Sequence, residues 1–101
     1  MRRPEPAITA GTALFTFEVP AASLKEKRSI IRPLVERMRS RFNAAVVEAG
    51  PDRPDRAVIA AACLSTDGAH VQSQLQSLLS FVERSHTDAV LVDVKTDSFV
   101  I

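Results

Sequence analysis

The sequence predicts an α+β protein built as a two-layer sandwich, in which a four-stranded antiparallel sheet carries two helices on one face. The first observation is the order of the expected elements, β-α-β-β-α-β. The second is that apolar residues alternate in the first and last strands but recur at three- and four-residue steps in the two helices. Two right-handed strand–helix–strand units joined in this order give the ferredoxin-like sandwich, whose second sheet face stays open.

Length and composition indicate one domain without a membrane segment. The chain has 101 residues, of which 46% are hydrophobic and 25% charged, as in ordinary globular proteins. No apolar run approaches the roughly 20 residues that cross a bilayer, and the single cysteine cannot form an internal disulfide. We therefore expect a cytoplasmic protein with no membrane partner. A disordered tail over residues 1–10, where prolines replace a signal core, precedes one folded domain over residues 11–101.

The first strand is expected from Gly11 to Val19, before Pro20. One of its faces carries the apolar residues Ala13, Phe15, Phe17 and Val19. We expect the two phenylalanines to point into the core. An exposed base-stacking pair, as in RNA-binding sheets, is the alternative.

A long amphipathic helix is expected from Ser23 to Phe42. Ser23 and Glu26 form a capping box, in which Ser23 is the N-cap and Glu26 reaches back to its amide. Apolar residues follow at helical steps: Leu24, Ile31, Leu34, Val35, Met38 and Phe42. Pro33 removes a backbone hydrogen bond, but the apolar stripe continues in phase, so we predict one helix with a kink near residues 29–33.

The same helix concentrates the positive charge of the chain. Seven basic and two acidic residues give it a net charge of +5, whereas the whole chain has +1. At about 100° per residue, four basic residues fall on one flank of the apolar stripe and form what we call the basic ridge: Lys25, Arg28, Arg32 and Arg39. Lys27 and Arg41 fall on the other flank, where their stems can extend around the edge of the core.

Two strands and a loop are expected in the middle of the chain. Residues 43–48 form a short strand, and the proline-bearing residues 50–55 form an exposed loop. Residues 56–65, RAVIAAACLS, are compatible with a helix or a strand, because alanine favours helices. Their length and the Val-Ile pair favour a central strand covered by helices.

The last third of the chain predicts a second helix and a final strand. Asp67 or Thr66 caps a helix that ends near Arg84, and its apolar stripe consists of Val71, Leu75, Leu78, Leu79 and Val82. In residues 89–95, Val90, Val92 and Val94 alternate with Leu91, Asp93 and Lys95. Residues 98–101 are a candidate extension of this strand after a bend.

No motif for catalysis, a metal or a cofactor emerges from the sequence. Cys63, His70 and His86 lack paired ligand spacing, and Cys63 lies in an apolar strand, where a free cysteine packs as a small hydrophobic residue. The serines are cap and turn residues without a nucleophile elbow, and the three glycines are too scattered for a phosphate-binding loop. We expect a protein that is not an enzyme and holds no cofactor.

The stretch SLKEKRSIIRPLVERMRSRFNAAVVE, residues 23–48, resembles the YlxP-like family of small bacterial proteins, a domain-of-unknown-function family. The spacing to His70 and to the Phe-Val-Glu end of the second helix, residues 81–83, is similar too. The resemblance covers most of residues 11–97, whereas the tail and the loop at residues 50–54 depart from it. It implies a ferredoxin-like fold. Because family genes lie beside genes for translation initiation and ribosome maturation, it also implies a role with RNA or ribosomes.

Two functions follow as hypotheses. The first is a non-enzymatic domain that binds structured RNA or a ribosomal subunit by shape and charge, with no DNA specificity. Its phosphate contacts would come from Lys25, Lys27, Arg28, Arg32, Arg39 and Arg41. The second is a protein-interaction or homodimerisation module that uses the open sheet face, which would bear Leu14, Leu91 and small alanines. A solvated helix face and a small-molecule regulatory domain are the remaining alternatives.

Overall fold

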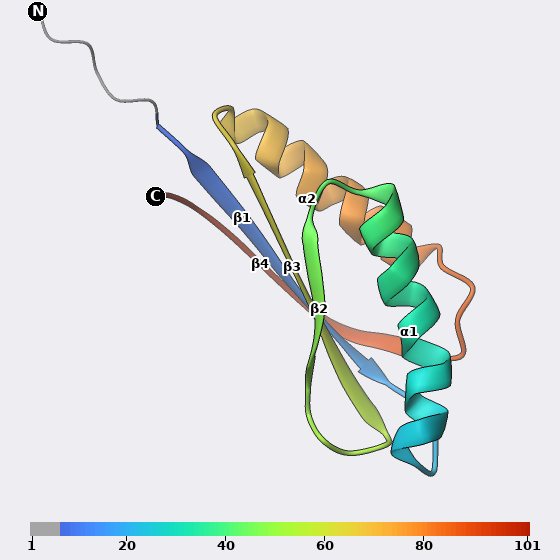
Figure 1. Ribbon diagram of the computed structural model, residues 1–101. Helices are drawn as coiled ribbons and strands as arrows, with labels where there is room; N and C mark the ends of the chain where they lie inside the picture. The colour runs from blue at the N-terminus through green and yellow to red at the C-terminus, as the bar shows by residue number, and fades with distance from the viewer. Residues whose placement is uncertain (1–6) are drawn as a thin grey trace, which may run out of the picture.

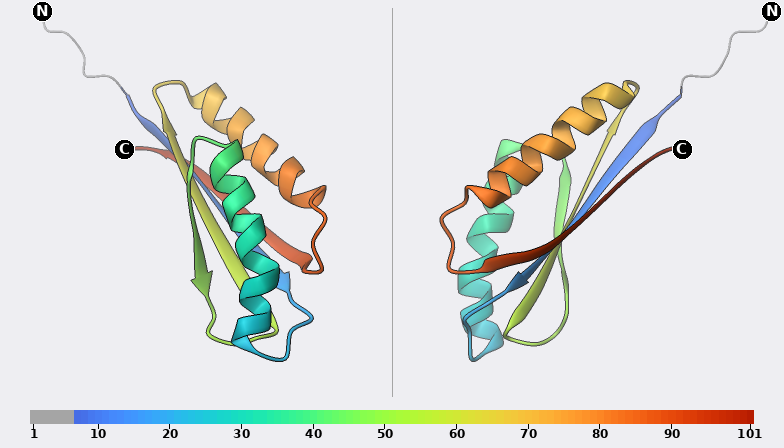
Figure 2. Two further views of the ribbon diagram at one scale, coloured as in Figure 1. Left: turned by 45° about the vertical axis from the view of Figure 1, so that its right-hand side comes forward. Right: turned by 180° about the vertical axis from the view of Figure 1, so that it is seen from behind.

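The computed structural model describes residues 7–101. Its elements follow the predicted order: β1 (Thr9–Glu18), α1 (Leu24–Arg41), β2 (Ala45–Gly50), β3 (Arg56–Ser65), α2 (Gly68–Glu83) and β4 (Val90–Val100). The strands form one antiparallel sheet in the order β2-β3-β1-β4. Figure 1 and Figure 2 show both helices on one face of the sheet and none on the other. The predicted ferredoxin-like arrangement is confirmed.

Three boundaries differ from the prediction. β1 begins at Thr9, so Thr9 and Ala10 belong to the sheet and not to the predicted tail, whose residues 1–6 lie outside the described residues. β2 covers residues 45–50, two positions later than expected, because the chain still turns at residues 42–44 after α1. β4 runs to Val100 without the expected bend, so it includes residues 98–100 of the candidate extension and not Ile101.

The core lies between the helix layer and the inner face of the sheet. The largest side chains with less than 2% exposure come from both layers: Phe15, Phe17, Ile31, Leu34, Met38, Ile59, Val71 and Leu78. The two phenylalanines of β1 therefore point into the core, as predicted, and are not a base-stacking pair. Each such side chain contributes roughly 1.5–3 kcal/mol by its burial.

Gly11 allows α2 to approach β1 closely. A β carbon at this position would lie 2.5 Å from Val71 Cγ1 on α2 and 3.3 Å from Cys63 Sγ on β3. Interiors are packed too densely to admit such a contact without movement. Cys63 itself is 4% exposed, which confirms its predicted place in the core.

Both helices begin at predicted caps. Ser23 Oγ accepts a hydrogen bond from the amide of Glu26 at 3.1 Å, and Asp67 caps α2. Glu26 Oε2 accepts from the amide of Ala22 at 3.2 Å, one residue before the amide that the capping box predicted. α1 continues through Pro33 as one helix of 18 residues, as expected. The kink in this helix stays a prediction.

A β-bulge in β4 places Leu91 on the core side of the sheet and not on the predicted open face. Two neighbouring residues of β1 pair with Leu91 and Asp93, so Val92 is left without a partner. Because side chains alternate along a regular strand, one extra residue changes which of them face the core. Both Leu91 and Val94 pack against the core as a result. The prediction that Leu91 lies on the open sheet face is wrong.

Candidate nucleic-acid interface

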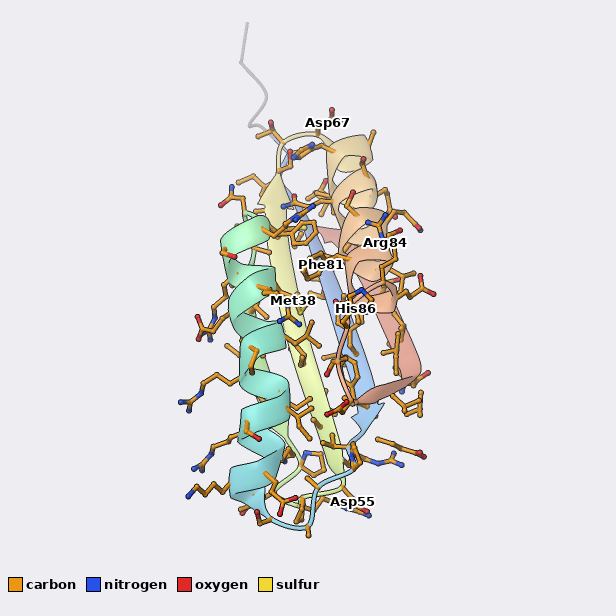
Figure 3. The ribbon with its side chains drawn as sticks, turned by 90° about the vertical axis from the view of Figure 1, so that its right-hand side faces the viewer. Met38, Asp55, Asp67, Phe81, Arg84 and His86 are labelled. Atoms are coloured by element: carbon orange, nitrogen blue, oxygen red, sulfur yellow. The ribbon has the colours of Figure 1, made fainter. Side chains whose placement is uncertain are left out.

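The basic ridge lies on the flank of α1 that borders β2. Arg39 shows this most directly, because its Nε donates to the carbonyl oxygen of Val46 on β2 at 2.9 Å. Figure 3 shows long side chains that project from α1 on the side turned away from α2. All four ridge residues are exposed: Lys25, Arg28, Arg32 and Arg39. The structure thus brings them together on one accessible surface.

Most of the ridge charge is not neutralised by acidic side chains. Within residues 7–101, Lys25, Arg28 and Arg32 form no ion pair. Arg39 Nη1 lies 3.4 Å from Glu36 Oε1, but these side chains are 48% and 61% exposed. Such an exposed pair contributes at most about 1 kcal/mol and can be exchanged for another anion.

Lys27 does not belong to this surface. The residue is 4% exposed, and its Nζ donates to the carbonyl oxygens of Pro51 and Arg53 at 2.8 Å and of Arg56 at 3.2 Å. Glu48 Oε1 lies 3.7 Å from the same nitrogen. The ammonium group therefore holds the loop between β2 and β3 against α1. We remove Lys27 from the residues proposed to contact phosphates.

Arg41 lies on the flank of α1 that faces α2. Its guanidinium carbon lies 5.6 Å from the ring centroid of Phe81, in cation–π geometry. The Phe81 ring also meets the Phe42 ring edge-on, with 5.5 Å between centroids. The breadth of a helix, about 10 Å with side chains, separates Arg41 from the ridge. The six residues predicted to bind nucleic acid thus comprise a ridge of four, a buried lysine and a separate arginine.

The groove between the helices carries further basic residues that the sequence did not assign to a site. Arg37 and His86 line a hollow of about 590 Å³ between α1 and the segment after α2. Arg41 and Arg84 line a second hollow of about 370 Å³ between the helices. Figure 3 shows Phe81, Arg84 and His86 on this side of the molecule. Arg37 is one of the seven basic residues of α1 that the sequence shows. Arg84 and His86 lie near α1 only because α2 packs beside it.

The described residues were also searched for a metal site, a membrane-spanning helix and a reactive side chain. Among these residues, no three His, Cys, Asp or Glu side chains gather as metal ligands, and no helix is both long and apolar enough to cross a membrane. His70 and His86 are exposed. Burial raises the pKa of the Cys63 thiol, which disfavours the nucleophilic thiolate.

Sequence comparison assigns the chain to a family. The family described as "Protein of unknown function (DUF503)" matches residues 10–96. The chain belongs to the DUF503 family. This DUF503 domain is 31% identical over 64 residues to "Uncharacterized protein YlxP" of Bacillus subtilis (strain 168), and the alignment covers 62% of this chain and 70% of that protein. The YlxP-like resemblance is thereby confirmed.

A solved structure supports the fold of the DUF503 domain. The "De novo designed protein Foldit4" superimposes with a TM-score of 0.56 at 10% identity, over 91% of this chain and 96% of that one. At this level of identity the likeness concerns the fold alone.

Proposed function

We propose that this DUF503 domain is a non-enzymatic domain that binds the phosphate backbone of structured RNA, such as the RNA of a ribosomal particle. The observation that carries the proposal is the basic ridge, where Lys25, Arg28 and Arg32 are exposed and have no ion-pair partner among the described residues. RNA phosphates would supply these partners, and the release of counterions would drive binding. The gene context implied by the family resemblance supports RNA over other polyanions.

Recognition by shape and charge fits the aromatic residues of the chain. Trp and Tyr are absent, and Phe occurs five times. Phe99 is 50% exposed, whereas the other four are buried or packed against the core: Phe15, Phe17, Phe42 and Phe81. Single-stranded bases are read largely by stacking on exposed aromatic side chains. The ridge therefore suits the backbone of folded RNA better than the bases of a single strand.

Charge reversal with a matched control tests this function. The ridge variant replaces three residues by glutamate: Lys25, Arg28 and Arg32. The control variant has the same net charge and replaces three residues of the inter-helix groove by glutamate: Arg37, Arg41 and Arg84. Each protein is co-sedimented with ribosomal subunits and titrated with ribosomal RNA at low and high salt.

We expect the parent to bind at low salt and dissociate at high salt, because the contacts are electrostatic. The ridge variant should lose this binding, while the control keeps most of it. Each lost phosphate contact should also reduce the slope of log K against log salt concentration by about 0.7–0.9. A ridge variant that binds as well as the parent overturns the proposal.

A second candidate function is a protein-interaction or homodimerisation module on the open sheet face. Among residues 7–101, the exposed large apolar side chains lie on the strands or beside their ends: Ile8, Leu14, Val47, Leu64, Val90, Val92, Phe99, Val100 and Ile101. By strand register, Leu14, Val47, Leu64 and Phe99 share the face of the sheet opposite the helices. Exposed apolar residues that gather on one face mark interaction sites. An interface on this face predicts that the Leu14→Ser, Leu64→Ser double variant loses an association that the parent shows in solution. A monomeric parent excludes the homodimer.

A further inference from the structure

β4 forms a long free edge of the sheet. It pairs with β1 alone and extends over 11 residues. The opposite edge, β2, has six residues, and its Val46 carbonyl oxygen already accepts a hydrogen bond from Arg39 Nε. Unpaired backbone groups of an edge strand are a template for another strand. β4 is therefore the edge that is available for pairing.

The even-numbered residues near the end of β4 direct their backbone groups to the free edge. Ile101 N donates to the carbonyl oxygen of Ile8, which precedes β1, at 2.8 Å, so residue 101 faces β1. Because these groups point alternately to the two sides of a strand, those of Thr96, Ser98 and Val100 point away from β1. In the single chain the amide of Ser98 donates to Oδ1 of Asp97 at 2.9 Å, and strand pairing would exchange this local hydrogen bond for one across the edge. The odd-numbered residues of a second strand paired here would occupy non-hydrogen-bonded positions, where side chains lie closest.

Charged side chains of alternating sign follow the same strand on the open face. Asp93, Lys95 and Asp97 are exposed, and none of them forms an ion pair within the described chain. In an antiparallel pair of identical strands, the two-fold axis passes through a residue position, since opposite residues must share a face. An axis at Lys95 would oppose like charges, because Lys95 would meet itself and Asp93 would meet Asp97. An axis at Thr96 instead places each Lys95 opposite Asp97 of the second copy.

The exposed valines of β4 favour the same register. An axis at Thr96 sets Val92 opposite Val100 of the second copy, and these side chains are 45% and 66% exposed in the single chain. An axis at Val94 would also oppose unlike charges. It would, however, place the bulged Val92 only two residues from the axis, whereas an axis at Thr96 leaves Val92 at the end of the new ladder. It would also leave Val100 unpaired. The pairing of opposite charges and the contact between valines therefore both favour a two-fold axis at Thr96.

We propose that the protein forms a two-fold symmetric dimer by antiparallel pairing of β4 with β4 of a second copy, centred on Thr96. The product is an eight-stranded sheet with four helices on one face. The basic ridges lie toward its two outer ends, since the ridge borders β2. Pairing of β4 with β2 of another copy would leave free edges and grow into a filament, but β2 is short and partly covered by Arg39. The dimer uses a surface separate from the ridge and does not depend on RNA binding.

Charge exchange tests the register. The parent should sediment at twice the 11.0 kDa of one chain. Lys95→Asp and Asp97→Lys each create two like-charge pairs across the axis, and each should weaken dimerisation about tenfold or more. The double variant restores opposite charges at both pairs and should dimerise like the parent. A parent that is monomeric at high micromolar concentration overturns the proposal, and so does a double variant as weak as the single ones.

Cross-linking provides a second measurement that does not alter charge. In a Cys63→Ala background, Thr96→Cys places the only thiol opposite its own copy, at about 5.5 Å between Cα atoms, which is within disulfide range. Ser98→Cys is the matched control, because its two copies would lie about 14 Å apart along the strands. We expect mild oxidation to join Thr96→Cys chains rapidly and Ser98→Cys chains slowly. Equal rates, or the reverse order, overturn the Thr96 register.

Discussion

A buried ammonium group joins α1 to the loop between β2 and β3. Lys27 Nζ reaches three carbonyl oxygens, those of Pro51, Arg53 and Arg56, and Glu48 lies near it. Burial of a charge is tolerated only when fixed polar groups replace its hydration shell. The carbonyl groups in turn depend on Lys27 as a donor. The contact of Lys27 with this loop joins segments about 25 residues apart in the sequence. A local sequence pattern cannot predict it.

Replacement of Lys27 by methionine should lower the free energy of unfolding by about 2–4 kcal/mol, because three carbonyl groups lose a charged donor. Urea denaturation measures the loss. Lys25→Met is the matched control, since Lys25 is exposed on the same turn, and it should change the free energy by less than about 0.5 kcal/mol. Equal losses would contradict the anchoring role.

Gly11→Ala should destabilise the fold by about 1–3 kcal/mol, because the new methyl group would overlap Val71 Cγ1. The Gly11→Ala, Val71→Ala double variant removes the overlap. Its loss should therefore be smaller than the sum of the two single losses in a double-mutant cycle. Additive losses would show that the close approach of α2 does not explain this glycine.

The thiol of Cys63 should react slowly in the folded protein. Burial raises its pKa, so the neutral thiol persists near pH 8.5, where a free cysteine is half ionised. Labelling with a thiol reagent at this pH should be fast in urea and slow without it. Fast labelling under native conditions would contradict a buried, protonated thiol.

At the scale of elements, α1 could be predicted almost completely because its signals are local. The N-cap, the apolar stripe and the basic ridge each depend on residues within a few turns. β4 could not be predicted to the same depth, because its bulge arises from pairing with β1 and reverses the face of Leu91. Lys27 was misplaced for a similar reason, since its acceptors lie in a distant loop.

Ser23→Ala should cost about 1 kcal/mol of stability, because the amide of Glu26 loses its acceptor at the N-terminus of α1. Ser23→Asp keeps an acceptor at the N-cap and should retain most of the stability. Thermal unfolding of both variants measures the difference. A similar melting temperature for the two would argue against this cap.

At the scale of the whole molecule, three surfaces are separate: the ridge beside β2, the open sheet face and the β4 edge. The flank occupied by the ridge could be predicted from helical geometry. Its position beside β2 could not, because a single helix does not reveal its neighbours. Arg84 and His86 approach Arg37 and Arg41 only through the packing of the two helices.

The ridge and the β4 edge together predict a coupling between association and RNA binding. A dimer would present two ridges to one long RNA, so both would contribute to the release of counterions. The Lys95→Asp variant should bind ribosomal RNA with about half the salt slope of the parent. RNA too short to reach both ridges should show the same slope for both proteins. Equal slopes on long RNA would contradict the joint use of the ridges.

The bulge in β4 gives this strand an unusual tolerance to a change in length. Loss of one residue inside a strand ordinarily turns every later side chain to the opposite face. Loss of Val92 would instead bring Leu91 next to Asp93, and both would keep their present partners on β1. The same loss at Thr96 would direct Asp97 toward the helix layer. A residue can therefore be deleted at position 92 of β4 without turning the later side chains of the strand to the opposite face of the sheet.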